Sequence, residues 1–115
     1  GVLCAIHLHC RVGEHAFIGG CAAVTCDVIP YASAVGNHAR LAGLNIIGLK
    51  RRGFGRDALR DLRAAYRILF LGEGVFQARV ESVREKFPHS PEVKRMLAFI
   101  DENKSRPLMS AAREY

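Results

Sequence analysis

A six-residue repeat at the start of the chain limits its possible folds more than any other feature. With the register set at Ile6, every sixth residue up to Val24 is β-branched and aliphatic. The fifth position of each unit, from Cys10 to Val28, holds a small or medium-sized residue. In a triangular coil the aliphatic residue points into a narrow interior, and small residues fit where space is short. The pattern predicts a left-handed parallel β-helix over residues 1–29, with about one and a half coils.

The repeat begins at the first residues with no capping segment before it. A solenoid needs about three or more repeats to bury a continuous core. Its open end would also present unpaired strand edges that promote aggregation. We therefore expect further coils upstream in the complete protein.

Charge is distributed unevenly between the two halves of the chain. The 17 Lys and Arg residues exceed the 11 Asp and Glu residues, giving a net charge of +6. This excess lies after residue 49, where basic and acidic residues alternate in the pattern of solvated helix faces. Recognition of a small anion needs fewer charges than nucleic-acid binding, so we expect no nucleic-acid partner. Since the sequence shows neither a membrane-length apolar run nor a leader, we expect a cytoplasmic protein with no membrane span.

Four cysteines fall in the repeat region, and two of them lie close to histidines. Cys4 and Cys10 flank His7 and His9, but the spacing fits no familiar zinc pattern. Both cysteines occupy the small fifth position of a repeat unit, where a buried thiol is a suitable filler. We therefore predict free thiols, a reducing compartment and no metal site.

Pro30 is expected to end the repeats, with residues 30–54 forming a loop and extended connection. The remaining region, 55–115, is predicted to be a C-terminal helical domain. Apolar residues at helical spacing indicate helices over about 56–71 and 74–86, and a third that Ser90 caps. The tail after Asn103 is expected to be loose. Three such helices would be marginally stable unless they pack on another element.

Three short motifs in residues 36–54 resemble the UDP-N-acetylglucosamine O-acyltransferases that begin lipid A synthesis in Gram-negative bacteria. They are Gly36-Asn37-His38-Ala39, Gly43-Leu44-Asn45 and Gly48-Leu49-Lys50-Arg51-Arg52-Gly53-Phe54. Three upstream pieces also match, namely Ala5-Ile6-His7, Gly19-Gly20-Cys21 and Asp27-Val28-Ile29-Pro30-Tyr31. The resemblance covers nearly the whole chain, but only the C-terminal part of a family member.

The resemblance implies an acyl transfer without metal or cofactor. An (R)-3-hydroxyacyl group would move from acyl carrier protein to the 3-hydroxyl of UDP-N-acetylglucosamine. A histidine of the family acts as general base, because a neutral imidazole can accept a proton near neutral pH. That histidine corresponds to a position upstream of Gly1. The family also implies a homotrimer with active sites between subunits.

Several residues take candidate roles through the resemblance. His7 matches a supporting histidine near the sugar, although spacing alone would make it an exposed repeat residue. His38 matches a substrate-pocket position, although Asn-His after glycine is also an ordinary turn. Gly20 matches the floor of the acyl-chain pocket, and a corner glycine would serve equally well there.

The motif from Asn45 to Arg52 is the candidate nucleotide site. Asn45, Arg51 and Arg52 match substrate-binding positions, and an arginine can hold phosphate oxygens through two parallel hydrogen bonds. A solvated basic loop is the alternative interpretation. His9, His15 and His89 match no family position, and we expect them at the surface.

Two departures from the family pattern leave other functions open. Leu8 stands where the family usually has Gln, and Ile47 stands where it usually has Glu. A related hexapeptide transferase acting on another nucleotide sugar is therefore one alternative. Another is a non-catalytic basic module that binds acyl carrier protein or nucleic acid. Its surface would be the stripe of Arg56, Arg60, Arg63 and Arg67.

Overall fold

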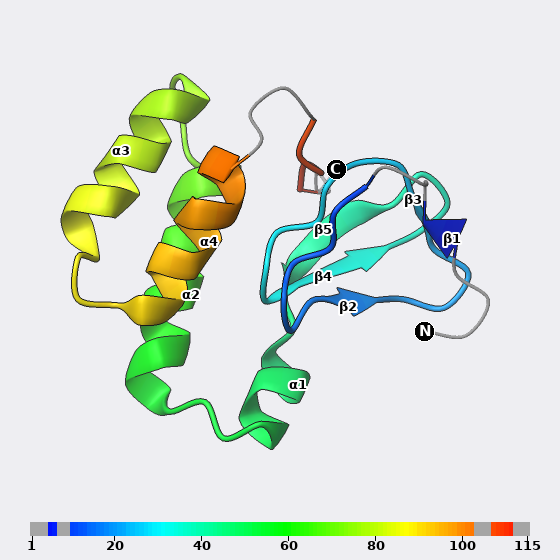
Figure 1. The fold of residues 1–115 in the computed structure, drawn as a ribbon, viewed down its shortest axis with the longest axis horizontal. Helices are drawn as coiled ribbons and strands as arrows, with labels where there is room; N and C mark the ends of the chain where they lie inside the picture. The colour runs from blue at the N-terminus through cyan, green and yellow to red at the C-terminus, as the bar shows by residue number, and fades with distance from the viewer. Residues whose placement is uncertain (1–4, 7–9, 103–106, 112–115) are drawn as a thin grey trace.

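The six-residue units form short strands that stack in parallel, one coil above the next. The computed structural model describes residues 5–6, 10–102 and 107–111 (Figure 1). Strand β1 (Ala5–Ile6) pairs with β3 (Ala23–Val24), placing Ala5 beside Ala23, three six-residue units later. Strand β2 (Phe17–Ile18) pairs in parallel with β4 (Ala32–Val35). The predicted parallel coil is therefore present.

The aliphatic position of the repeat becomes more deeply buried along the chain. Ile6 is 45% exposed and Val12 is 39% exposed, whereas Ile18 is 9% and Val24 is 1% exposed. The same register therefore faces solvent in the first units and the core in the later ones. The coil is apolar and uncovered on its N-terminal side within the described residues.

Parallel stacking continues beyond Pro30, so the expectation that this proline ends the repeats is wrong. Ile18 lies beside Ala34, and the Tyr31 amide donates to the Glu14 carbonyl at 2.9 Å. A proline is tolerated here because it occupies a corner of the coil, where its missing N–H is not needed for the ladder. Its ring packs against Gly13, where a Cβ atom would collide with the Pro30 backbone.

Residues 30–54 contain more regular structure than the loop and extended chain that we expected. Strand β5 (Arg40–Leu44) runs antiparallel to β4, and the helix α1 (Ile46–Arg51) follows it. The short helix gave no clear signal, because six residues are too few to display an amphipathic period. Whether the chain divides at residues 29 and 54 stays a prediction.

Three longer helices follow α1 and lie together on one side of the strands (Figure 1). They are α2 (Arg56–Leu71), α3 (Phe76–Lys86) and α4 (Pro91–Glu102), which confirms the helices predicted there. The Ser90 hydroxyl accepts the Val93 amide at 3.2 Å, as expected of an N-cap. Their buried stripes include Leu62, Val83 and Leu97. None of the described helices is long and apolar enough to cross a membrane.

The expectation of a loose tail is wrong for residues 107–111. Leu108 forms a parallel bridge with Asp27, and Ala111 forms one with Leu41. The Met109 side chain is 1% exposed. This segment returns to the strands after α4, and the two bridges supply the backbone bonds that order it. Tertiary hydrogen bonding of this kind leaves no periodic signal in so short a sequence.

Candidate functional site

The Gly43–Gly53 segment places the basic motif on a short, capped helix. The Asn45 side chain caps α1, because its Oδ1 accepts the Gly48 amide at 3.3 Å. Its Nδ2 donates to the His15 carbonyl at 3.1 Å. A Cβ atom at Gly48 would collide with the side-chain amide of Asn45, so the glycine allows this side chain to cap the helix. Both polar atoms of the Asn45 side chain thus have partners within the chain, and a substrate contact by this residue stays a prediction.

The arginines at the end of α1 are exposed. Arg51 is the last helical residue, and the backbone amide of Arg52 caps the helix through the Gly48 and Leu49 carbonyls. Gly53 has φ +86°, a left-handed conformation that lets the chain turn away after the helix. The two side chains are therefore held on a defined backbone and can reach a ligand in solvent.

An aromatic cluster supports this helix from the side of the coil. The His15 ring stacks on Tyr31 with centroids 5.9 Å apart, and its centroid lies 5.2 Å from that of Phe54. The Tyr31 carbonyl accepts a hydrogen bond from the backbone amide of Asn45 at 2.7 Å. His15 is half-buried, so it lies at the surface only in part, with its ring packed against Tyr31 and Phe54. A solitary histidine in sequence carries no sign of ring contacts made by residues far apart in the chain.

Tyr31 and Tyr66 are buried phenols near the aromatic cluster, where α2 packs on β5. The Tyr66 hydroxyl accepts the Gly43 amide at 3.2 Å, which joins α2 to β5. Burial raises the pKa of Tyr66, because the phenolate would lose its hydration, and the Gly43 bond opposes part of this shift. Burial also raises the pKa of Tyr31. The Arg95 guanidinium interacts with the Tyr31 hydroxyl and opposes part of this shift in pKa.

A basic groove lies between α1 and α2. Its volume is about 760 Å³, and its apolar floor includes Phe54 and Leu59. The basic residues that line it are Lys50, Arg56, Arg60, Arg63 and Arg67. Among the described residues, only Arg60 of this set forms an ion pair, with Asp57 and Asp61. The other four basic residues therefore give the groove a local excess of positive charge, which no ion pair within the described residues neutralises.

His38 and Gly20 lie apart from this groove. His38 precedes β5 and Asn45 follows it, so the length of this strand separates them. His38 is exposed at the tip of the β4–β5 hairpin and has φ +57°. The same tip pairs with the coil, since the Ala39 amide donates to the Ala23 carbonyl at 2.8 Å. Gly20 is exposed at the turn that precedes β3.

The candidate residues thus form two groups at opposite ends of β5. His7 and Leu8 lie outside the described residues, so the structure does not place them. Cys4 and His9 lie outside them too. No group of three or more His, Cys, Asp or Glu residues within the described ranges is arranged to hold a metal. The chemistry that this part of the chain can supply is anion binding by exposed guanidinium groups.

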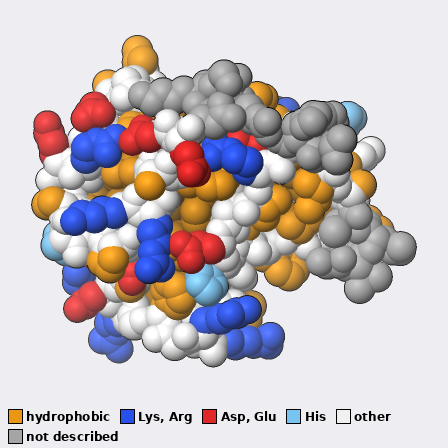
Figure 2. Space-filling view, in the orientation of Figure 1, with side chains coloured by type: hydrophobic (Ala, Val, Ile, Leu, Met, Phe, Trp, Pro, Cys, Tyr) orange, Lys and Arg blue, Asp and Glu red, His pale blue; other side chains and the backbone are white. Residues whose placement is uncertain are grey.

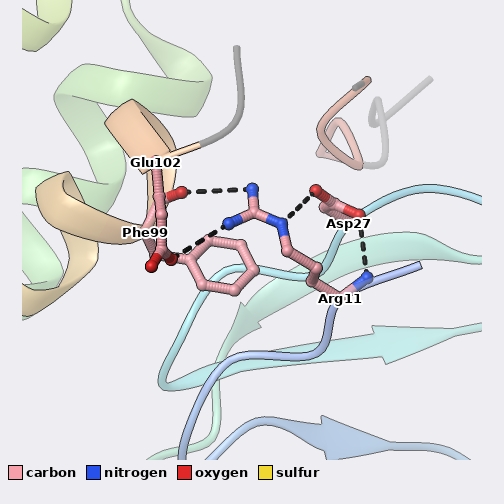
Figure 3. A network of polar contacts seen from close by, with 4 residues as sticks. All are labelled: Arg11, Asp27, Phe99 and Glu102. Carbon is pink, nitrogen blue, oxygen red and sulfur yellow. Dashed lines mark hydrogen bonds and ion pairs between the residues drawn. The ribbon is translucent and has the colours of Figure 1, made fainter. Parts of the chain in front are cut away.

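Arg11 fixes α4 against the coil, with two contacts to Asp27 in the coil and two to α4 (Figure 3). The Asp27 carboxylate, 2% exposed, accepts the Arg11 amide and the Arg11 Nε, both at 2.8 Å. The Arg11 guanidinium also donates to the Phe99 carbonyl at 3.2 Å and to the Glu102 carboxylate at 3.3 Å. It lies 4.2 Å from the centre of the Phe99 ring. Sequence alone did not identify this link, because its members are separated by most of the chain.

The chain is similar to known proteins both in sequence and in fold. The family model described as "Udp N-acetylglucosamine O-acyltransferase; Domain 2" matches residues 27–109. The acyl-(acyl-carrier-protein)–UDP-N-acetylglucosamine O-acyltransferase of Caulobacter vibrioides is 52% identical over 92 residues, covering 80% of this chain and 35% of that protein. The enzyme of the same name from Bartonella henselae is 47% identical over 102 residues, covering 89% of this chain and 37% of that protein.

Solved structures show the same relationship. The UDP-N-acetylglucosamine acyltransferase of Arabidopsis superposes with a TM-score of 0.85 at 34% identity, covering 96% of this chain and 40% of that structure. The enzyme from Bacteroides fragilis gives a TM-score of 0.84 at 29% identity, covering 97% of this chain and 42% of that structure. The chain therefore spans roughly two fifths or less of the relatives described here.

Proposed function

Since this chain belongs to the UDP-N-acetylglucosamine O-acyltransferase family, we propose that it is the C-terminal part of an enzyme acylating a UDP-sugar. The reaction moves an (R)-3-hydroxyacyl group from acyl carrier protein to the 3-hydroxyl of UDP-N-acetylglucosamine, the first step of lipid A synthesis. The presentation of Arg51 and Arg52 at the end of a capped helix carries this proposal. Two exposed guanidiniums on a fixed backbone suit the two phosphates of a UDP-sugar.

Each candidate residue has a role in this proposal. Arg51 and Arg52 contact phosphate oxygens, and Asn45 orients their helix through its cap. His38 contacts substrate from the hairpin tip, and Gly20 leaves room for the acyl chain. His7 supports the reaction near the sugar. The general base is supplied by a histidine outside this chain, so we expect the isolated chain to give little or no turnover.

The exposed edge of the coil supports a fold that continues upstream. Ile6 and Val12 belong to the interior register but remain 45% and 39% exposed. Further coils of a left-handed β-helix, stacked on this side, would cover them as Ile18 and Val24 are covered here. Removing this apolar surface from water supplies the driving force for the stacking.

Association into a homotrimer is part of the same proposal. Phe17 and Val35 lie on the coil and are 48% and 42% exposed. Neighbouring exposed apolar side chains of this size are typical of contact surfaces between subunits. The native mass of the complete protein, measured by light scattering, tests this point. A monomeric mass would contradict it.

We propose that the basic groove between α1 and α2 receives the acidic acyl carrier protein. Arg56, Arg63 and Arg67 have no acidic partner within the described residues, so they are available to a negatively charged surface. On the face drawn in Figure 2, basic and acidic side chains are interspersed over the helices. The concentrated charge of the groove favours steering of an acidic partner, and the effect weakens as salt increases.

Charge reversal tests this docking site. The double variant Arg63→Glu, Arg67→Glu is expected to weaken binding of acyl carrier protein strongly and to flatten its salt dependence. The double variant Lys86→Glu, Lys94→Glu is the matched control, since both lysines are exposed but lie outside the groove. Equal loss in both variants would contradict docking in the groove. A steep salt dependence for DNA binding, with none for the carrier protein, would favour the nucleic-acid module instead.

A related transferase that uses another nucleotide sugar is a second candidate. Ile47 is 69% exposed on α1, beside the proposed nucleotide site. An isoleucine there cannot accept a hydrogen bond from a sugar hydroxyl, as the usual Glu could. Comparing UDP-N-acetylglucosamine with other UDP-sugars as acceptors tests this alternative, and Ile47→Glu should shift the preference toward UDP-N-acetylglucosamine. The expected cytoplasmic location stays a prediction.

A further inference from the structure

A second pocket lies at the C-terminal end of α2, where the three long helices meet the returning tail. It has a volume of about 430 Å³, within the range of small-molecule sites. Its walls come from α2, α3, α4 and residues 107–111, and none belongs to the 36–54 motif. Most of the wall is apolar, formed by Leu69, Phe70, Phe76, Ile100, Leu108 and Met109.

One cationic side chain, Arg79 on α3, lines this apolar pocket. Its Nη1 donates to the Leu69 carbonyl at 2.5 Å, at the last turn of α2. The guanidinium carbon lies 5.2 Å from the centre of the Phe76 ring. These two contacts hold the planar group in place. Gln77 also lines the pocket, but its amide donates to Glu81 at 3.3 Å.

The Arg79 Nε is buried and has no hydrogen-bond partner within the described residues. Leaving a charged donor buried without an acceptor is costly, so such a group calls for a ligand or another acceptor. Nε and Nη2 form one edge of the guanidinium, and a carboxylate pairs with such an edge through two parallel hydrogen bonds. The Leu69 carbonyl is bonded to Nη1, so this contact does not use Nε.

We propose that this pocket binds a free fatty acid of medium chain length. The carboxylate accepts from Nε and Nη2 of Arg79, and the hydrocarbon chain packs among Phe70, Phe76 and the apolar residues of the tail. A single cation among apolar walls suits a monocarboxylate better than a phosphate, which needs more donors. This ligand differs from the acyl donor of the proposed reaction, because a thioester has no free carboxylate. The inference therefore does not rest on the proposed function.

Calorimetric titration of the complete protein with three matched probes tests the proposal. Sodium decanoate should bind with one site per chain, whereas decan-1-ol should bind at least about tenfold more weakly, because it lacks the charge-assisted pair. Decylamine, of opposite charge, should show no binding at this site. Arg79→Met should reduce decanoate affinity by at least about tenfold. Lys86→Met, an exposed lysine on the same helix, should leave it unchanged.

Arg79 also holds the end of α2, so its loss can disturb the fold. Two further measurements therefore use proteins that retain Arg79. Ala111→Phe fills the pocket from the tail and should abolish decanoate binding with the charge intact. In the wild-type protein, decanoate should shift the Arg79 Nε–H signal in a nitrogen–proton correlation spectrum. Equal affinity for decanoate and decan-1-ol, or an Arg79 signal that does not move at saturation, would overturn the proposal.

Discussion

Replacing Arg11 by methionine should destabilise the protein far more than replacing its exposed partner. Arg11 joins the coil to α4 through the buried Asp27 carboxylate, the Phe99 carbonyl and Glu102. Methionine keeps an apolar stem of similar length but removes the guanidinium. Asp27, only 2% exposed, would then retain the backbone amide at position 11 and lose its cation.

The magnitude follows from the burial of each contact. Breaking a buried ion pair from one side costs about 3–5 kcal/mol, because a charge is left uncompensated. The Arg11 side chain is 22% exposed, and water reaching that site compensates part of the loss. We therefore expect a reduction in the free energy of unfolding of about 2–4 kcal/mol. Glu102, whose side chain is 74% exposed, should contribute less than about 1 kcal/mol to the same network.

Urea unfolding followed by far-ultraviolet circular dichroism measures these differences. Glu102→Gln is the control on the solvent side of the network. Adding Asp27→Asn to Arg11→Met should recover part of the lost stability, since the amide removes the buried charge and keeps an acceptor for the position 11 amide. An Arg11→Met variant no less stable than Glu102→Gln would refute this account of how α4 is held.

Four further single variants and one double variant test separate features of the fold. Ser90→Ala should lower stability by about 1 kcal/mol by removing the cap of α4, and Ser90→Asp should restore it; equal stability of all three proteins would exclude the cap. Gly13→Ala should cost about 1–3 kcal/mol, because its Cβ would strike the facing proline backbone. Gly55→Ala, with open space around it, is the control, and equal melting temperatures would contradict the close packing of the coil corner. Because burial raises the folded-state pKa of Tyr31 and Tyr66, the folded protein holds their protons more tightly than the unfolded chain. Their contribution to the free energy of unfolding is complete below about pH 10 and is lost as pH rises above it. Above about pH 10 the melting temperature should therefore fall less steeply in a variant with phenylalanine at both positions than in the wild-type protein.

The sequence predicted the parts of the fold that repeat. The six-residue spacing from Ile6 to Val24 specified the parallel coil, because an aliphatic residue recurs at the same position of every unit. The apolar spacing in 56–71 specified α2 in the same way. Both signals are periodic and local, so one sequence suffices to detect them.

The features that the sequence did not predict are contacts between distant segments. The return of residues 107–111 to the strands depends on single bridges to Asp27 and Leu41, which leave no pattern in the tail itself. His15 packs on Tyr31 and Phe54 because the coil and the helix meet there. Of the candidate site, the basic motif was identified through family resemblance. The groove beside it required the relative placement of α1 and α2.

The most direct test of the central claim is acyl transfer by the complete protein that contains this chain. Purified enzyme is incubated with (R)-3-hydroxyacyl carrier protein and UDP-N-acetylglucosamine, and the nucleotide sugar is analysed by mass spectrometry. We predict the 3-O-acylated UDP-sugar, with the rate at limiting acceptor reduced at least about tenfold in an Arg51→Ala, Arg52→Ala variant that remains folded. An enzyme that leaves UDP-N-acetylglucosamine unmodified while acylating another nucleotide sugar, or none, would contradict the claim.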